Sequence, residues 1–175
     1  MNGIPTVLRA LYEGERALEQ ALLSTAERHP AEHEVHHVAT DLARWSHEHA
    51  ERIARGAEPQ GLHLSDPGPG SPSSMRAKTE PPAHTLDEPS DPDLRLLDDL
   101  RALHLAVADN SLHWEMLAQA AQATGDNRLL ELSTACHPQT LRQMRWTNTM
   151  IKTLSPQLLS NANGFSRTAA SSARR

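Results

Sequence analysis

Glu15 is a carboxylate placed within an otherwise apolar helical stripe. A 4-3-4-3 spacing, typical of the buried stripe of a bundle helix, runs through Ile4, Leu8, Leu11, Glu15, Leu18 and Leu22. Burying a carboxylate costs free energy unless the group is paired with a cation, hydrogen bonded or bound to a metal ion. The pattern therefore identifies Glu15 as the first candidate for chemistry in this chain.

Polar residues recur within the apolar stripes of three later helical segments. They are Ser46 and His49 in residues 31–56, Asn110 in residues 93–125, and His137 and Thr140 in residues 127–155. Counted from the turns of a four-helix bundle, all of them lie within one or two helical turns of the level of Glu15. Imidazole nitrogens and carboxylate or amide oxygens are ligands for divalent iron, zinc or manganese. The sequence thus predicts a site for one such ion, with the ligands Glu15, His49, His137 and Asn110.

Four helical segments must position these residues. The first covers residues 4–28 and stops at His29-Pro30, and the second covers residues 31–56. The third begins at Asp91-Pro92-Asp93, an N-cap followed by proline in the first turn, and the fourth runs from Asn127 to Ser155-Pro156. No strand pattern competes with them. The sequence therefore predicts an all-α, antiparallel four-helix bundle.

The remaining segments separate two helical hairpins. Residues 57–92 contain eight of the twelve prolines together with glycine and serine, which predicts a linker. This linker is long enough to return along the bundle as a crossover between the second and third helices. The predicted organisation is a hairpin at 1–56, the linker at 57–92, and a second hairpin at 93–156. Both hairpins belong to one bundle domain, and a flexible tail follows at 157–175.

The stretch from Leu42 to Ile53 resembles a helix of rubrerythrin-like and other ferritin-like proteins. Those proteins carry Glu-x-x-His followed by a small residue and a downstream arginine, as in Ser46-His47-Glu48-His49-Ala50-Glu51-Arg52 apart from the first position. Their di-iron site takes one Glu from each of two helices and Glu-x-x-His from each of the other two. By this resemblance Glu15 matches the first-helix Glu, and His49 matches the second-helix His.

The departures from that pattern change the functional expectation. Ser46 and Asn110 stand at two expected Glu positions, while His137 stands at the third and Thr140 at the following His position. Only one of four carboxylates remains, and two irons need bridging carboxylates. We therefore expect a ferritin-like protein with a degenerate metal site, neither an iron-storage shell nor a di-iron oxidase.

An alternative function uses no metal and no catalysis. In it, Glu15 pairs with a histidinium, and the polar residues near its level have only a structural role. The protein is then a homodimeric helical interaction or scaffold module. Apolar positions outside the core stripes, such as Leu97, Met116 and Leu141, would form the contact surface. His33 and His37 have the i, i+4 spacing of a helical chelate, but they lie near the first turn and are expected on a solvated surface.

Composition narrows the classes of partner. A formal net charge of −5 argues against a general nucleic-acid-binding surface. No run of about 18 apolar residues predicts a membrane span, and no signal-peptide pattern occurs, so we expect a cytoplasmic protein. The single cysteine, Cys136, excludes an internal disulfide and any multi-cysteine metal site.

Overall fold

The computed structural model describes residues 3–65 and 91–172, with side chains described as far as residue 160. Four long helices account for most of these residues: α1 (Ile4–Arg28), α2 (His33–Ala57), α4 (Pro92–Thr124) and α5 (Asn127–Ser172). A short 3₁₀ helix, η1 (Glu58–Gln60), follows α2. The described residues include no strand, which confirms the all-α prediction. Most of the predicted linker, residues 66–90, lies outside the described residues.

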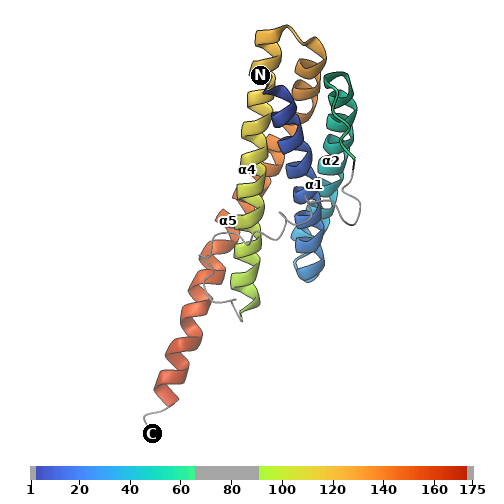
Figure 1. Ribbon diagram of the computed structural model, residues 1–175. Coiled ribbons are helices and arrows are strands. Elements are labelled where there is room, and N and C mark those ends of the chain that lie inside the picture. The colour runs from blue at the N-terminus through green and yellow to red at the C-terminus, as the bar shows by residue number, and fades with distance from the viewer. Residues whose placement is uncertain (1–2, 66–90, 173–175) are drawn as a thin grey trace.

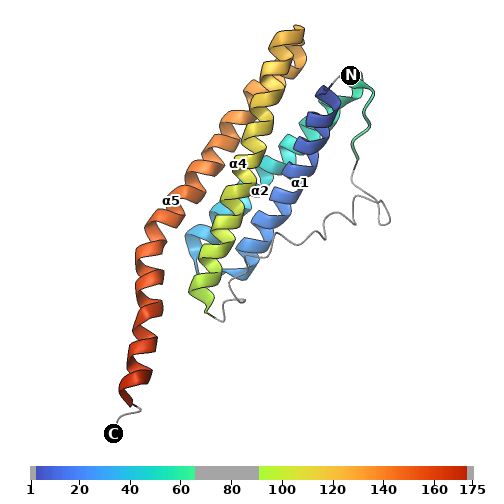
Figure 2. The ribbon, with the colours of Figure 1, turned by 60° about the vertical axis from the view of Figure 1, so that its left-hand side comes forward.

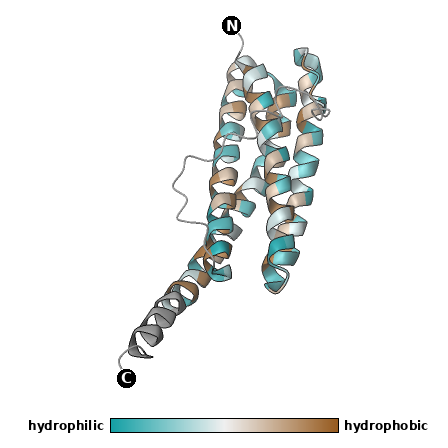
Figure 3. Ribbon diagram, turned by 60° about the horizontal axis from the view of Figure 1, so that its bottom comes forward, coloured by the Kyte–Doolittle hydropathy of each residue, from teal (hydrophilic) through white to brown (hydrophobic). Residues whose placement is uncertain are grey.

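The helices pack as a bundle of two pairs. Short loops join α1 to α2 and α4 to α5, and each of these pairs is in extensive contact (Figure 1). The pairs meet because α1 packs against α4 and α2 packs against α5. Every helix carries hydrophilic and hydrophobic residues in alternating bands, as an amphipathic bundle helix requires (Figure 3).

Local capping chemistry explains the boundaries of α4. The Asp91 carboxylate accepts a hydrogen bond from the Asp93 backbone N–H at 3.0 Å, and Pro92 occupies the first turn of α4. Gly125 ends α4 with a left-handed φ of 68°, a conformation that costs glycine little. The predicted bounds of α1 are confirmed, whereas α2 begins two residues later than predicted and ends one residue later.

The predicted end of the fourth helix is wrong. Instead of stopping before Pro156, α5 continues to Ser172, so most of the segment predicted as a flexible tail is helical. Proline removes one backbone donor and crowds the preceding turn, but apolar packing continues on both sides of it. Leu154 and Leu158 lie against the cluster that contains Leu100 and Met150. Beyond this contact α5 projects past the other three helices (Figures 1 and 2).

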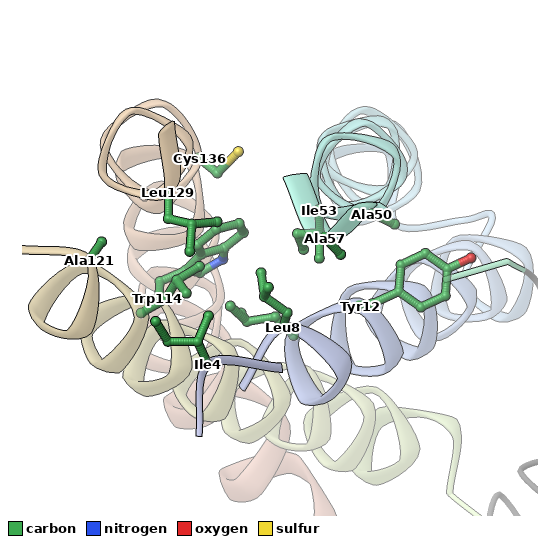
Figure 4. Packing of buried hydrophobic residues seen from close by; sticks show 12 residues of the cluster. Ile4, Leu8, Tyr12, Ala50, Ile53, Ala57, Trp114, Ala121, Leu129 and Cys136 are labelled. Carbon is green, nitrogen blue, oxygen red and sulfur yellow. The ribbon is translucent and has the colours of Figure 1, made fainter. Parts of the chain in front are cut away.

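The core consists of three apolar clusters along the bundle. One end is formed around Leu8, Ile53, Trp114 and Leu129, with side chains from all four helices converging between them (Figure 4). The middle cluster contains Leu18, Leu22, Leu103 and Val107, and the far end contains Val35, Leu96, Leu100 and Met150. Buried polar residues lie between the first two clusters. Among the described residues, no helix has both the length and the apolarity needed to cross a membrane.

Candidate functional site

Glu15 is completely buried, with 0% of its surface exposed. Its Oε1 atom accepts a hydrogen bond from the Trp114 indole N–H at 3.0 Å, which fixes the carboxylate against α4. The same oxygen lies 3.3 Å from Nδ1 of His49 on α2. The second carboxylate oxygen, Oε2, has no hydrogen-bond partner. Glu15 and His49 therefore meet between α1 and α2, and one oxygen of the carboxylate has no hydrogen-bond partner.

His49 is also completely buried, and its ring packs edge-on against Trp114 with 5.8 Å between ring centroids. Its Nε2 atom lies 2.8 Å from the side-chain oxygen of Gln139 on α5, so Nε2 donates its proton there. Its Nδ1 atom makes no hydrogen bond, despite the nearby Glu15 oxygen. The ring is thus oriented by Gln139, with Nδ1 directed at the carboxylate.

Asn110 and Thr140 complete the same level from the other two helices. We call the level of Glu15, His49, Asn110 and Thr140 the polar level. The contacts Ser111–His137 and His104–Thr147 set the register of α4 against α5, and this register places Asn110 beside Thr140. Among the described residues, six buried polar side-chain atoms have no hydrogen-bond partner. Four of them, one from each helix, belong to this level: Glu15 Oε2, His49 Nδ1, Asn110 Nδ2 and Thr140 Oγ1. The other two, Gln143 Oε1 and Trp146 Nε1, lie about one and two turns further along α5. Unsatisfied buried polar atoms are rare in folded proteins, so their concentration at one level is informative.

His137 does not join this group. Its Nε2 atom lies 2.9 Å from the Ser111 hydroxyl, on the flank of α5 that faces α4, and its ring is half-buried. Burial lowers the pKa of His137, and the nearby Glu115 carboxylate opposes that shift. Of the four predicted ligands, Glu15 and His49 are in contact, and Asn110 is buried near their level. His137 lies at a similar level, beside the neighbour of Asn110, but on the flank of α5 instead of its inner face.

The reason is a rotation of the buried stripe of α5. An inward-facing stripe that contains His137 also contains Leu130, Met144 and Ile151, whereas the structure buries the preceding residues, Leu129, Cys136, Gln143 and Met150. Ser133, Thr140 and Thr147 belong to both stripes and are buried. A shift of one residue turns the helix by about 100° and exchanges His137 for Cys136 on the inner face.

Cys136 is buried but chemically quiet. Burial raises the pKa of its thiol to about 11, although the neighbouring Arg52 guanidinium acts in the opposite direction. The thiolate is the form that attacks electrophiles and binds metals, so the neutral thiol is a poor nucleophile and ligand near pH 7.

Two glutamines that the sequence interpretation left out stabilise the polar level. Gln139 orients His49, and Gln143 donates to the Leu42 carbonyl at 3.1 Å and to the Ser46 hydroxyl at 2.9 Å. Ser46, at an expected Glu position, is thus engaged by Gln143. An inward stripe that begins at Leu129 would have identified Gln143, but Gln139 lies beside either stripe.

The histidine-rich start of α2 lies apart from this level. His33 and His37 are exposed, with their rings stacked 6.2 Å apart, and His36 contacts the Ala26 carbonyl. Within residues 3–65 and 91–172, no group of three or more His, Cys, Asp or Glu side chains is placed to hold a metal ion. An ion at the polar level would therefore have two strong protein ligands, Glu15 and His49, with amide, hydroxyl or water oxygens completing its shell.

The arrangement offers one carboxylate and one imidazole for binding, without a second carboxylate that could bridge two ions. It includes no activated nucleophile, because the buried thiol is neutral. The chain matches no protein-family model, no curated protein and no solved structure.

Proposed function

We propose that this protein is a helical bundle with a degenerate ferritin-like metal site that binds one divalent transition-metal ion between Glu15 and His49. The observation that carries the proposal is the 3.3 Å separation of Glu15 Oε1 and His49 Nδ1, two buried acceptor atoms without a hydrogen bond between them. An unprotonated Nδ1 directs its lone pair at the Glu15 oxygen, and the two atoms repel each other at this distance unless a cation lies next to both.

The separation also fits coordination. Two ligand atoms about 2.0–2.1 Å from a tetrahedral zinc ion lie roughly 3.4 Å apart. A second ring proton, on Nδ1, would make His49 a histidinium and supply the missing positive charge instead. It would, however, leave that buried N–H without a well-aligned acceptor.

The groups behind the two ligands support the same proposal. A metal-binding histidine almost always donates its other ring N–H to an oxygen, which fixes the ring and increases its basicity. His49 does this through Gln139 at 2.8 Å, and the Trp114 N–H holds the Glu15 carboxylate at 3.0 Å. Asn110 and Thr140 are buried with side-chain atoms that lack a partner, and in this proposal they would supply further oxygen ligands after rotation of their side chains.

The proposed role is structural. Both ligands are 0% exposed, so a bound ion would link α1 to α2 in the interior, and it would join the second hairpin only through Asn110 or Thr140. When bound, the ion supplies positive charge that compensates Glu15. A single carboxylate does not bridge two irons, so the proposal includes neither iron storage nor di-iron oxidation.

The ferritin-like part of the proposal concerns the chain path. Contacts pair Glu15 with Trp114 and Arg28 with Asp99, so residue numbers rise along α1 as they fall along α4. In Figure 1, α2 ends near the start of α1, whereas α4 begins at the opposite end. These directions support a crossover connection between α2 and α4, as in ferritin-like bundles.

Thermal unfolding with and without a chelator tests the site. Metal-loaded, tag-free wild type is expected to lose roughly 5–10 °C in Tm on chelation, which corresponds to a ligand present at about 100 times its Kd. Glu15→Gln keeps the size of the side chain but removes the charge, and its Tm should not respond to the chelator. Glu34→Ala is the matched control, because Glu34 is exposed on α2, and it should respond like wild type.

Two results would overturn the proposal. One is a wild type whose Tm is unchanged by chelation, which leaves the structural ion pair of Glu15 with a histidinium. The other is a Glu15→Gln variant that still responds fully, which places the ion on the surface histidines.

A further inference from the structure

The outer face of α4 is apolar. Leu105, Leu112 and Met116 are 53%, 61% and 54% exposed, and their spacing of seven and four residues places them on one side of the helix. This side lies opposite the buried stripe that contains Leu103, Asn110 and Trp114. A bundle helix normally needs one apolar stripe, so the second stripe on α4 is unexplained by the fold of a single chain.

α5 extends this surface. His137 contacts Ser111 on α4, and Leu141 lies one turn after His137, so Leu141 shares the flank of α5 that faces α4. The register of the two helices places Leu141 beside residues 108 and 109, and it is 39% exposed. We call the surface formed by Leu105, Ala108, Leu112, Met116 and Leu141 the α4 face.

We propose that the α4 face binds a second copy of this chain, with the two α4 helices antiparallel around a two-fold axis near Ala108. A two-fold axis there places Leu105 of one copy opposite Leu112 of the other, and the small side chain of Ala108 allows the helices to approach closely. The arrangement therefore pairs leucine with leucine on both sides of the axis.

Charge complementarity supports this occupant. Arg101 and Glu115 are exposed and lie beyond opposite ends of the Leu105–Leu112 pair. In the antiparallel arrangement, Arg101 of one copy falls within one residue of Glu115 of the other, and this happens twice because of the symmetry. Asp109 borders the axis, so the arrangement brings one pair of like charges together between the two Arg101–Glu115 pairs.

Sedimentation over a range of protein concentrations tests the proposal on the full chain. Wild type should show a reversible monomer–dimer equilibrium, and Leu112→Glu should raise its Kd at least tenfold. Leu159→Glu changes a leucine that is similarly exposed, at 51%, but lies outside the α4 face, so its Kd should equal that of wild type. Circular dichroism should show equal helix content in all three proteins, because both substitutions are at exposed positions.

A charge exchange tests the antiparallel arrangement. Arg101→Glu places like charges together and should raise the dimer Kd, whereas Arg101→Glu with Glu115→Arg restores opposite charges and should lower it again. The two residues are 14 positions apart on one helix and do not meet within a chain, so restoration reports contact between copies. A wild type that stays monomeric at all concentrations, a dimer that survives Leu112→Glu, or a double variant that is no better than the single one would overturn the proposal.

This inference does not depend on the proposed metal site. The dimer equilibrium is expected in the presence of a chelator as well as with metal, since the α4 face and the Glu15 level lie on opposite sides of α4.

Discussion

The side-chain oxygen of Asn110 lies directly over Gly14, so closely that a β-carbon at Gly14 would come within 2.2 Å of it. This contact brings α1 and α4 together at the polar level, where a larger residue would keep the helices apart. The glycine one residue before the buried carboxylate is therefore part of the arrangement that places Glu15 against Trp114.

Gly14→Ala should destabilise the fold. In an unhindered helix this change would stabilise by roughly 0.5–1 kcal/mol, but the clash with Asn110 should instead cost about 1–3 kcal/mol. Denaturant unfolding in the presence of a chelator measures the difference without any contribution from metal. Gly56→Ala is the control, because the added carbon meets only the tip of the Leu132 side chain, at 3.0 Å.

The cause of the Gly14→Ala effect can be checked with a double variant. Gly14→Ala combined with Asn110→Ala should be more stable than the sum of the two single effects predicts, because the clash disappears with the Asn110 side chain. Additive effects, or a Gly14→Ala protein more stable than wild type, would show that α1 and α4 are not in this close contact.

Cys136 should resist thiol reagents in the folded protein. Its side chain is 0% exposed and its pKa is raised to about 11, so almost no thiolate is available near pH 8. A disulfide reagent should therefore label Cys136 only after denaturant unfolds the chain. Labelling of the native protein at the rate of a free thiol would contradict the buried position of Cys136 on α5.

The raised pKa of Cys136 also affects stability at alkaline pH. Folding favours the neutral thiol, so the thiol contributes fully to the stability of the fold below its ordinary pKa of 9.0. This contribution is lost as the pH rises toward about 11. Wild type should lose more stability than Cys136→Ala between pH 9 and pH 11. Equal losses in the two proteins would show that the thiol titrates normally.

His137 should reduce stability as the pH falls through its ordinary pKa of 6.5. Burial lowers its pKa in the folded state, so below pH 6.5 the unfolded chain binds the proton more readily than the folded chain. This binding stabilises the unfolded state relative to the folded state. Urea unfolding at pH 7 and pH 5 should show a smaller loss for His137→Gln than for wild type. The same loss in both proteins would mean that other histidines account for the pH dependence.

Asp99 should stabilise the junction between α4 and the end of α1. Its carboxylate accepts two hydrogen bonds from Arg28, at 2.8 and 3.0 Å, and lies 2.7 Å from Nε2 of His29. Asp99→Asn should cost about 1 kcal/mol in unfolding free energy, less at high salt. Asp41→Asn is the control, because Asp41 contacts Arg44 on the exposed surface of one helix and should change stability little.

The helices were predictable because local signals define their ends. The Asp91 cap, Gly125 and the His29-Pro30 stop all act through short-range contacts that the sequence contains directly. Pro156 misled the prediction, because the packing of Leu154 and Leu158 outweighs the local effect of a proline. Tertiary contact of this kind cannot be read from the residues beside it.

The inward-facing residues of α5 were only partly predictable. Two stripes one residue apart fit the pattern of α5 almost equally well, because each contains three apolar residues: Leu129, Cys136 and Met150 in one, and Leu130, Met144 and Ile151 in the other. Packing against α2 selects the stripe with Cys136 and Gln143, because the Gln143 side chain donates a hydrogen bond to the Leu42 carbonyl of α2. In contrast, the apolar residues of α1 fit only one inward-facing stripe, so the prediction that Glu15 is buried is confirmed.

Metal content measured by mass spectrometry tests the central claim most directly. Tag-free protein is equilibrated with zinc or manganese and then passed through a weak chelating resin, which removes ions bound by the exposed His33 and His37. Our account predicts about one ion per chain in wild type and none in Glu15→Gln. No ion in wild type, two ions per chain, or an equal content in Glu15→Gln would contradict it.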